Sequence, residues 1–305
     1  MEQDSRVFVG HRHEWGGDTP FGLDVAERRQ HVYVIGQTGA GKSTLLRNLI
    51  LQDIEDGRGV ALIDPHGDLA ADVLENIPPQ RTGDVVYFDP AERDPLALNL
   101  FRATGENWHL VTAGIVSAFK KIWGNSWGAR LEYILYATLA ALLQCENTSL
   151  LGVSRMLYDD RYRAWVVKQV KDPMVRSFWV NEFANYDRSF RQEVVSPIQN
   201  KVGQLFLSPP LRNVLGQVTS KINFRFMMDQ KRIFIANLSK GRIGEAHSSL
   251  LGSLLVTGFE IAALSRADIP PHQREDFFLY ADEFHHYATD SFASILSVRQ
   301  LASAL

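Results

Sequence analysis

The octapeptide Gly-Gln-Thr-Gly-Ala-Gly-Lys-Ser at residues 36–43 constrains the fold of this chain more than any other segment. It fits the pattern G-x-x-x-x-G-K-[ST], in which glycines let the backbone N–H groups of a loop converge on a phosphate chain. Such a loop lies between a strand and a helix, because the helix directs its positive N-terminus at the phosphates. The segment therefore predicts an α/β fold with a nucleotide-binding loop.

The residues of this loop have separate expected roles in binding ATP and Mg²⁺. Lys42 reaches the β- and γ-phosphates, and the Ser43 hydroxyl ligates the metal ion. The full set of expected nucleotide contacts is Gly36, Gln37, Thr38, Gly39, Ala40, Gly41, Lys42, Ser43 and Thr44.

The segments around the loop alternate between strand and helix patterns. The apolar, β-branched run 31–36 predicts a buried strand, and residues 42–55 show helical spacing. Strands at 59–64 and 84–89 follow, with a short helix at 66–76 between them. This rhythm predicts a parallel sheet that is covered on both faces.

The rhythm then stops, and helical patterns run from about residue 106 to 218, including strong ones at 131–143 and 190–206. Strand patterns return at 232–237 and 277–282, with a helix at about 245–265 between them. We therefore expect a P-loop core in two parts, at 1–105 and 221–305, interrupted by an all-helical insertion at 106–220.

The strand pattern Phe277–Ala281 ends in two carboxylates, Asp282 and Glu283. A P-loop site needs an acidic residue at a nearby strand end, so we expect Asp282 to hold Mg²⁺. Glu283 is the expected general base, which favours hydrolysis over transfer to a bound acceptor. Asp64 ends another apolar strand and is a competitor for the metal role, with a simple strand cap as the alternative.

Composition excludes several classes of protein. The net charge of −3 gives no global attraction to nucleic acid, and the single cysteine, Cys145, excludes internal disulfides and cysteine zinc clusters. No apolar run reaches the roughly 18 residues of a membrane span. The run 250–264 contains Glu260 and indicates a buried helix, and the N-terminus lacks a signal-peptide pattern. We expect a soluble, intracellular chain.

Together these motifs resemble the ring-shaped DNA-pumping ATPases of the HerA–FtsK type, and among them the conjugative coupling proteins of type IV secretion systems. The resemblance rests on Val-Tyr-Val-Ile-Gly-Gln-Thr-Gly-Ala-Gly-Lys-Ser-Thr, then Ile-Asp-Pro-His-Gly-Asp, then Tyr-Ala-Asp-Glu-Phe. The runs Ala236–Gly241 and Ala288–Phe292 and the helical insertion add to it.

The resemblance implies a RecA-like core, a hexameric ring and ATP-driven movement of DNA. It implies a trans-acting arginine, for which Arg242 is our candidate, and contacts with relaxase or secretion-channel proteins. It also implies a cytoplasmic location, which partner proteins can place at the inner face of the membrane.

Three features depart from the resembled family. The chain has no N-terminal membrane helices, and the sheet is expected to end after the acidic strand and one helix, without the strand that carries a polar sensor. The third feature is His285-His286. Because adjacent residues on a helix point apart, we do not expect this pair to share a metal ion.

Direct evidence for nucleic acid is limited. Basic residues and tryptophans occur together in the insertion, where bases can stack on aromatic rings, but such tryptophans are more often core residues. The basic set is Arg161, Arg163, Lys168 and Lys171, and the tryptophans are Trp123, Trp127, Trp165 and Trp179. The leading hypothesis is a DNA-translocating ATPase. A nucleotide-gated binding module and a small-molecule kinase are the alternatives.

Overall fold

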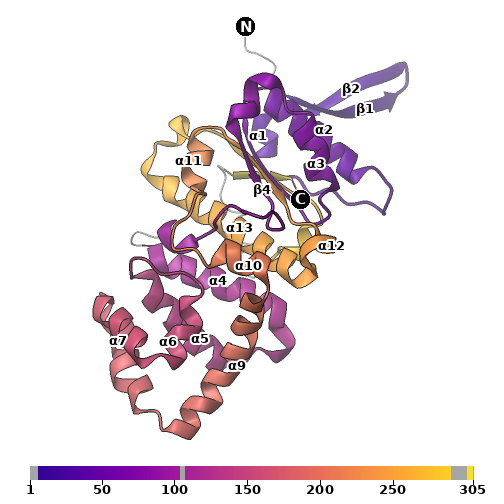
Figure 1. Ribbon diagram of the computed structural model, residues 1–305. Helices are drawn as coiled ribbons and strands as arrows, with labels where there is room; N and C mark the ends of the chain where they lie inside the picture. The colour runs from indigo at the N-terminus through magenta and orange to yellow at the C-terminus, as the bar shows by residue number, and fades with distance from the viewer. Residues whose placement is uncertain (1–5, 104–106, 290–300, 305) are drawn as a thin grey trace.

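The computed structural model describes residues 6–103, 107–289 and 301–304. Five parallel strands form one sheet in the order β4-β5-β3-β6-β7, and an antiparallel hairpin, β1–β2, lies outside it (Figure 1). The strands are β1 Val7–Glu14, β2 Gly17–Leu23, β3 Gly59–Asp64, β4 Val85–Phe88, β5 Ile233–Asn237, β6 Phe277–Ala281 and β7 Leu301–Ala304.

Helices cover both faces of the sheet and form the rest of the molecule (Figure 1). They are α1 Val25–Arg28, α2 Lys42–Glu55, α3 Asp68–Glu75, α4 Trp108–Trp123, α5 Ala129–Leu143, α6 Gly152–Tyr158, α7 Asp160–Gln169, α8 Pro173–Ser177, α9 Arg188–Leu207, α10 Pro209–Leu215, α11 Phe224–Asp229, α12 Lys240–Ile243 and α13 Glu245–Ser265. Local chemistry sets several of these starts. The Asp159, Asp172 and Asp187 side chains cap α7, α8 and α9 by accepting backbone hydrogen bonds.

The central strands β3, β5 and β6 are buried along their whole length and mostly apolar, because each one faces a core on both sides. In β3, Val60 and Leu62 pack with α2 and α3, whereas Ala61 and Ile63 face the opposite core. The same alternation in β5 and β6 follows from the two-residue period of a strand. Continuous apolar strands of this kind are typical of a buried parallel sheet.

The core that Ala61 and Ile63 face continues without interruption from the sheet into the helical region. α13 and α4 lie between the sheet and α5–α9 (Figure 1). The backbones of α4 and α13 approach closely, since a Cβ atom at Gly114 would lie 2.3 Å from Thr257 Cγ2. The helical region therefore shares its core with the nucleotide-site sheet.

Most predicted elements lie where the sequence placed them. α2, β3 and α13 have the predicted bounds, and the chain is helical between β4 and β5 within its described part. The expected boundary at residues 105 and 106 falls outside the described residues, and the one at 220 and 221 lies between α10 and α11.

The predicted buried strand at 31–36 is wrong. Only Val32 makes a strand-type bridge, and the Tyr33 and Ile35 side chains are 67% and 81% exposed. The β-branched sequence favours an extended backbone, but a strand also needs a neighbour with free hydrogen-bonding groups. β6 offers none, because β3 and β7 occupy its two edges.

A further strand follows the acidic strand, contrary to expectation. β7 pairs in parallel with β6, from Phe277 opposite Leu301 to Tyr280 opposite Ala304. The sheet therefore continues beyond Asp282. The helix expected after the acidic strand falls largely on residues 290–300, which lie outside the described residues, as does the 290–292 part of the Ala288–Phe292 run.

One helix among the described residues is long and apolar enough to span a membrane. It runs from Glu245 to Asp268, and 83% of its apolar window is buried inside the protein. This helix is α13 with the short turn that follows it, and the burial identifies it as the central core helix.

Candidate nucleotide-binding site

The glycine-rich loop has the backbone geometry that its motif predicts. Gly39 and Gly41 adopt φ values of 79° and 89°, in the left-handed region that favours glycine. Gly41 stands at the N-cap of α2, and among the described residues no side chain caps this helix. The first N–H groups of α2 are therefore available to an anion.

The ammonium group of Lys42 lies against the loop. Its Nζ donates hydrogen bonds to the carbonyl oxygens of Gly36 and Gln37, over 2.9 and 3.0 Å. The loop from Gly36 to Gly41 is exposed. The lysine charge and the free N–H groups thus converge on the same exposed loop.

Ser43 and Asp282 meet, although 239 positions separate them in the sequence. The Ser43 hydroxyl donates to Asp282 Oδ2 over 3.2 Å. Asp282 is 8% exposed and its backbone N–H bonds to the Ile63 carbonyl, which extends the β3–β6 ladder to the end of the strand. A hydroxyl and a carboxylate oxygen are ligands that Mg²⁺ prefers, so these two residues fit a magnesium ion.

Glu283 adopts a backbone conformation that is uncommon for its type, with a φ of 47°. Its Oε1 lies 3.0 Å from His66 Nε2. Its Oε2 lies 3.0 Å from Lys240 Nζ and 3.0 Å from His286 Nε2. The strained backbone therefore places the carboxylate among three nitrogen groups.

These neighbours keep the Glu283 carboxyl group ionised. Burial acts to raise its pKa, but the hydrogen bonds and charges of His66 and Lys240 outweigh burial and lower the pKa to about 2. Burial and the charge of Lys240 lower the pKa of His286.

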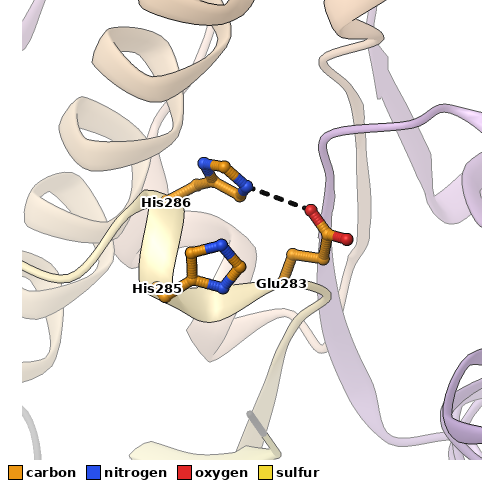
Figure 2. A group of neighbouring side chains, drawn as sticks. All are labelled: Glu283, His285 and His286. Atoms are coloured by element: carbon orange, nitrogen blue, oxygen red, sulfur yellow. Dashed lines mark hydrogen bonds and ion pairs between the residues drawn. The ribbon is translucent and has the colours of Figure 1, made fainter. Parts of the chain in front are cut away.

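His285 and His286 lie side by side, which corrects our expectation. Their ring centroids are 4.0 Å apart, and Figure 2 shows both rings beside the Glu283 carboxylate. The rule that neighbours point apart describes a continuous α-helix, whereas Phe284–His286 is a single 3-10 turn, η9. The ligand atoms of the three residues lie within 4.8 Å of one another.

This trio is nevertheless a poor metal site. Lys240 Nζ lies 2.7 Å from His286 Nε2 as well as close to Glu283. The ammonium group already uses the lone pairs that a metal ion would need, and its charge repels a second cation. We assign no metal to Glu283, His285 and His286.

Asp64 serves the backbone. Its Oδ1 accepts from the His66 N–H over 2.8 Å and its Oδ2 from the Ala70 N–H over 2.9 Å. Both oxygens thus secure the turn from β3 into α3. This geometry favours the strand-cap alternative for Asp64.

Arg242 lies away from the group around Ser43 and Asp282. It pairs with Asp89 at the end of β4, and β5 and β3 stand between β4 and β6 in the sheet. Its side chain is 48% exposed. Within one chain the structure does not bring Arg242 to the P-loop.

One cavity of about 280 Å³ joins the phosphate side to the acidic side. Its lining includes Gly36 and Lys42 of the loop and Asp282 and Glu283 of the strand end. Sequence reasoning identified all four but missed His66 and Lys240, which contact Glu283. Their sequence signals were their place just after a strand end and their position within the segments Ile63–Asp68 and Ala236–Gly241, which support the family resemblance.

The chain matches the family described as "Helicase HerA, central domain" over residues 8–255. No match was found among curated proteins. Among solved structures, the unbound bacterial conjugative coupling protein TrwBdeltaN70 has a TM-score of 0.64 at 14% identity, over 100% of this chain. The plasmid coupling protein TrwB with ADP and Mg²⁺ has a TM-score of 0.59 at 15% identity, over 96% of this chain and 68% of that one.

The TrwB likeness concerns the fold, and the chain spans 65% of the length of the unbound TrwB structure. The family match covers most of the chain and includes the P-loop, β3 and β5. The chain therefore belongs to the HerA helicase central-domain family and has a RecA-like P-loop fold of the HerA–FtsK type.

Proposed function

We propose that this chain hydrolyses ATP with Mg²⁺ and that hydrolysis drives DNA through a ring of subunits. The observation that carries the proposal is the single cavity that Lys42, Asp282 and Glu283 line, with Ser43 bonded to Asp282 beside it. TrwB binds a non-hydrolysable ATP analogue and, in another structure, ADP with Mg²⁺, which supports the choice of ligand.

Each residue has a distinct task in this reaction. The loop N–H groups and Lys42 bind the phosphates and offset the negative charge that grows on them. Ser43 and Asp282 hold Mg²⁺, which supplies further charge compensation when bound. Glu283 accepts the proton of the attacking water as general base.

Assembly into a hexameric ring is part of the proposal. In such a ring Arg242 reaches the γ-phosphate of a neighbouring subunit. Its half-exposed side chain leaves it accessible, but it must first leave its pair with Asp89. Conjugative transfer, with relaxase or channel proteins as partners, is the proposed biological setting.

A second candidate is a nucleotide-gated binding module with little hydrolysis. It is favoured by Glu283, whose carboxylate is engaged by three nitrogen groups and has a lowered pKa. A carboxylate this acidic is a weak base, and a module of this kind needs ATP binding more than turnover.

The deciding experiment measures ATP hydrolysis by the purified chain without DNA, with single-stranded DNA and with double-stranded DNA, at low salt. The motor predicts hydrolysis that DNA stimulates and that Glu283→Gln reduces to a small residual rate while ATP binding remains. ATP binding without turnover under every condition supports the binding module. Normal hydrolysis by Glu283→Gln would refute the assignment of the base.

A further inference from the structure

Three neighbouring strands bring their ends together around Glu283. β5, β3 and β6 are adjacent in the sheet, and the residues that follow them include Lys240, His66 and Glu283 respectively. These are the residues whose side chains meet, with both contacts to the carboxylate at 3.0 Å. The arrangement results from the sheet order and not from closeness in sequence.

Lys240 is held on its backbone as well as by its side chain. Its N–H donates to the Pro65 carbonyl over 2.9 Å, which ties the start of α12 to the loop after β3. The side chain is 21% exposed, and its Nζ reaches Glu283 and His286. The Lys240 side chain is therefore held at both ends, at the backbone and at the ammonium group.

The contacts leave the carboxylate with little freedom. An ionised carboxylate has about four acceptor positions. Lys240 uses one acceptor position on Oε2 and His66 uses one on Oε1. The His286 ring lies against the second position on Oε2, with its Nε2 3.0 Å from that oxygen. One position on Oε1 remains for a water molecule, so the contacts set the direction from which Glu283 accepts a proton.

We propose that Lys240 is the positioning residue of Glu283: it holds the carboxylate in the one orientation that accepts the proton of the attacking water. Lys240 acts through Glu283 and does not bind the nucleotide. The inference rests on the proposed ATP hydrolysis. Other charged or titratable groups around this carboxylate are His66, His285, His286, Asp282 and Lys42.

The test compares Lys240→Met and Lys240→Arg with the unchanged chain in steady-state ATP hydrolysis. We expect Lys240→Met to lower kcat about 10- to 100-fold, because small misplacements of a reacting group have effects of this size. The KM for ATP should stay within about twofold. Lys240→Arg keeps a donor to Oε2 and should restore part of kcat. Lys201→Met, at a surface lysine bonded to Ser126, is the matched control and should change neither parameter.

A double-mutant cycle with Glu283→Gln separates positioning from an independent role. In the Glu283→Gln background, Lys240→Met should change the residual rate by less than about twofold. A raised KM with unchanged kcat would make Lys240 a nucleotide ligand and overturn the proposal. Equal losses of kcat in both backgrounds, or no loss in either, would also overturn it.

If the unchanged protein hydrolyses no ATP, the contact between Lys240 and Glu283 can still be tested with the unchanged chain, Lys240→Met, Glu283→Gln and the double variant. That result defeats the proposed function, but melting temperatures still report the contact. If Lys240 holds Glu283, the melting-temperature shifts of the two single variants do not add in the double variant. Additive shifts mean that the two side chains do not interact, and the positioning role falls with them.

Discussion

The two sides of the nucleotide site are built in opposite ways. On the phosphate side, the loop from Gly36 to Gly41 is exposed, and Lys42 bonds to the carbonyls of that same loop. On the acidic side, Glu283 contacts groups that follow β3 and β5, and Asp282 continues the β3–β6 ladder. The protein itself positions the carboxylates, whereas the phosphates of a bound nucleotide are the natural partners of the loop.

The acidic side is also tied to the helical region. Lys121 of α4 donates to the His285 carbonyl over 2.9 Å. Ser249 and Ser253 of α13 donate to the carbonyls of His286 and Tyr287, over 2.6 and 3.2 Å. The loop after β6 is thus held by helices that share a core with α5–α9.

A buried network of hydrogen bonds connects the P-loop helix α2 with the acidic strand β6. The Arg28 guanidinium bonds to both oxygens of Asp53 in α2, over 2.7 and 2.6 Å, and to the Tyr280 hydroxyl in β6 over 2.8 Å. It also lies 3.7 Å from the centre of the Phe278 ring. This network fixes the P-loop helix to the acidic strand.

The largest expected effect is on the phosphate side. Lys42→Ala removes the charge that offsets the phosphates, so hydrolysis should fall by about 100-fold or more. Because Lys42 contacts only its own loop in the bonds described above, the free energy of unfolding should change by no more than about 0.5 kcal/mol. Turnover assays and urea unfolding measure these two quantities. Normal turnover would mean that the loop is not the phosphate site.

Breaking the network between the two sides should cost stability. Arg28→Met leaves the buried Asp53 carboxylate with Arg58 and the Tyr280 hydroxyl, and should lower the free energy of unfolding by about 3 to 5 kcal/mol. Arg29→Met is the control, since Arg29 pairs with Asp276 at a half-exposed position and should lose at most about 1 kcal/mol. Equal losses in urea unfolding would show that burial does not distinguish the pairs.

The buried Glu260 of α13 should make the stability of the protein depend on pH, independently of the acidic loop. Burial raises the pKa of Glu260 to about 7 from the ordinary 4.5. As the pH rises, Glu260 therefore loses its proton in the unfolded chain before it does so in the folded chain. The free energy of unfolding should fall as the pH rises from 4.5 to 7. Glu260→Gln removes this loss, and above pH 7 it should exceed the unchanged chain by about 2 to 3 kcal/mol. Parallel pH profiles of the two chains in urea unfolding would count against this account.

The smallest effect should come from the contact between α13 and the acidic loop. A Cβ atom at Gly252 would lie 2.1 Å from Tyr287 Cδ1, so Gly252→Ala must displace the ring and the chain that leads to Glu283. We expect a loss of about 1 to 3 kcal/mol and slower hydrolysis with unchanged ATP binding.

Gly203→Ala is the control for this contact. Gly203 is helical, and a Cβ atom there would have open space, so stability should rise by up to about 1 kcal/mol. If Gly252→Ala weakens ATP binding as much as hydrolysis, the proposed separation of the two sides is wrong.

Sequence alone determined the features that depend on neighbouring residues. The P-loop occupies eight consecutive positions, and helix α2 begins at Lys42 as its pattern predicts. The apolar runs of β3, β5 and β6 predicted a sheet with two covered faces, because a strand that is buried on both faces has a nearly continuous apolar sequence. The acidic pair at the end of β6 belongs to the same class of local signal.

Tertiary structure decided everything that depends on strand order. It placed β7 and not residues 31–36 beside β6, although the β-branched run 31–36 has the stronger strand propensity, since pairing and burial override propensity. It also brought Lys240 and His66 to Glu283, across 43 positions in the case of Lys240. Contacts between strand ends follow from how a sheet is ordered, and that order is a property of the packed chain as a whole.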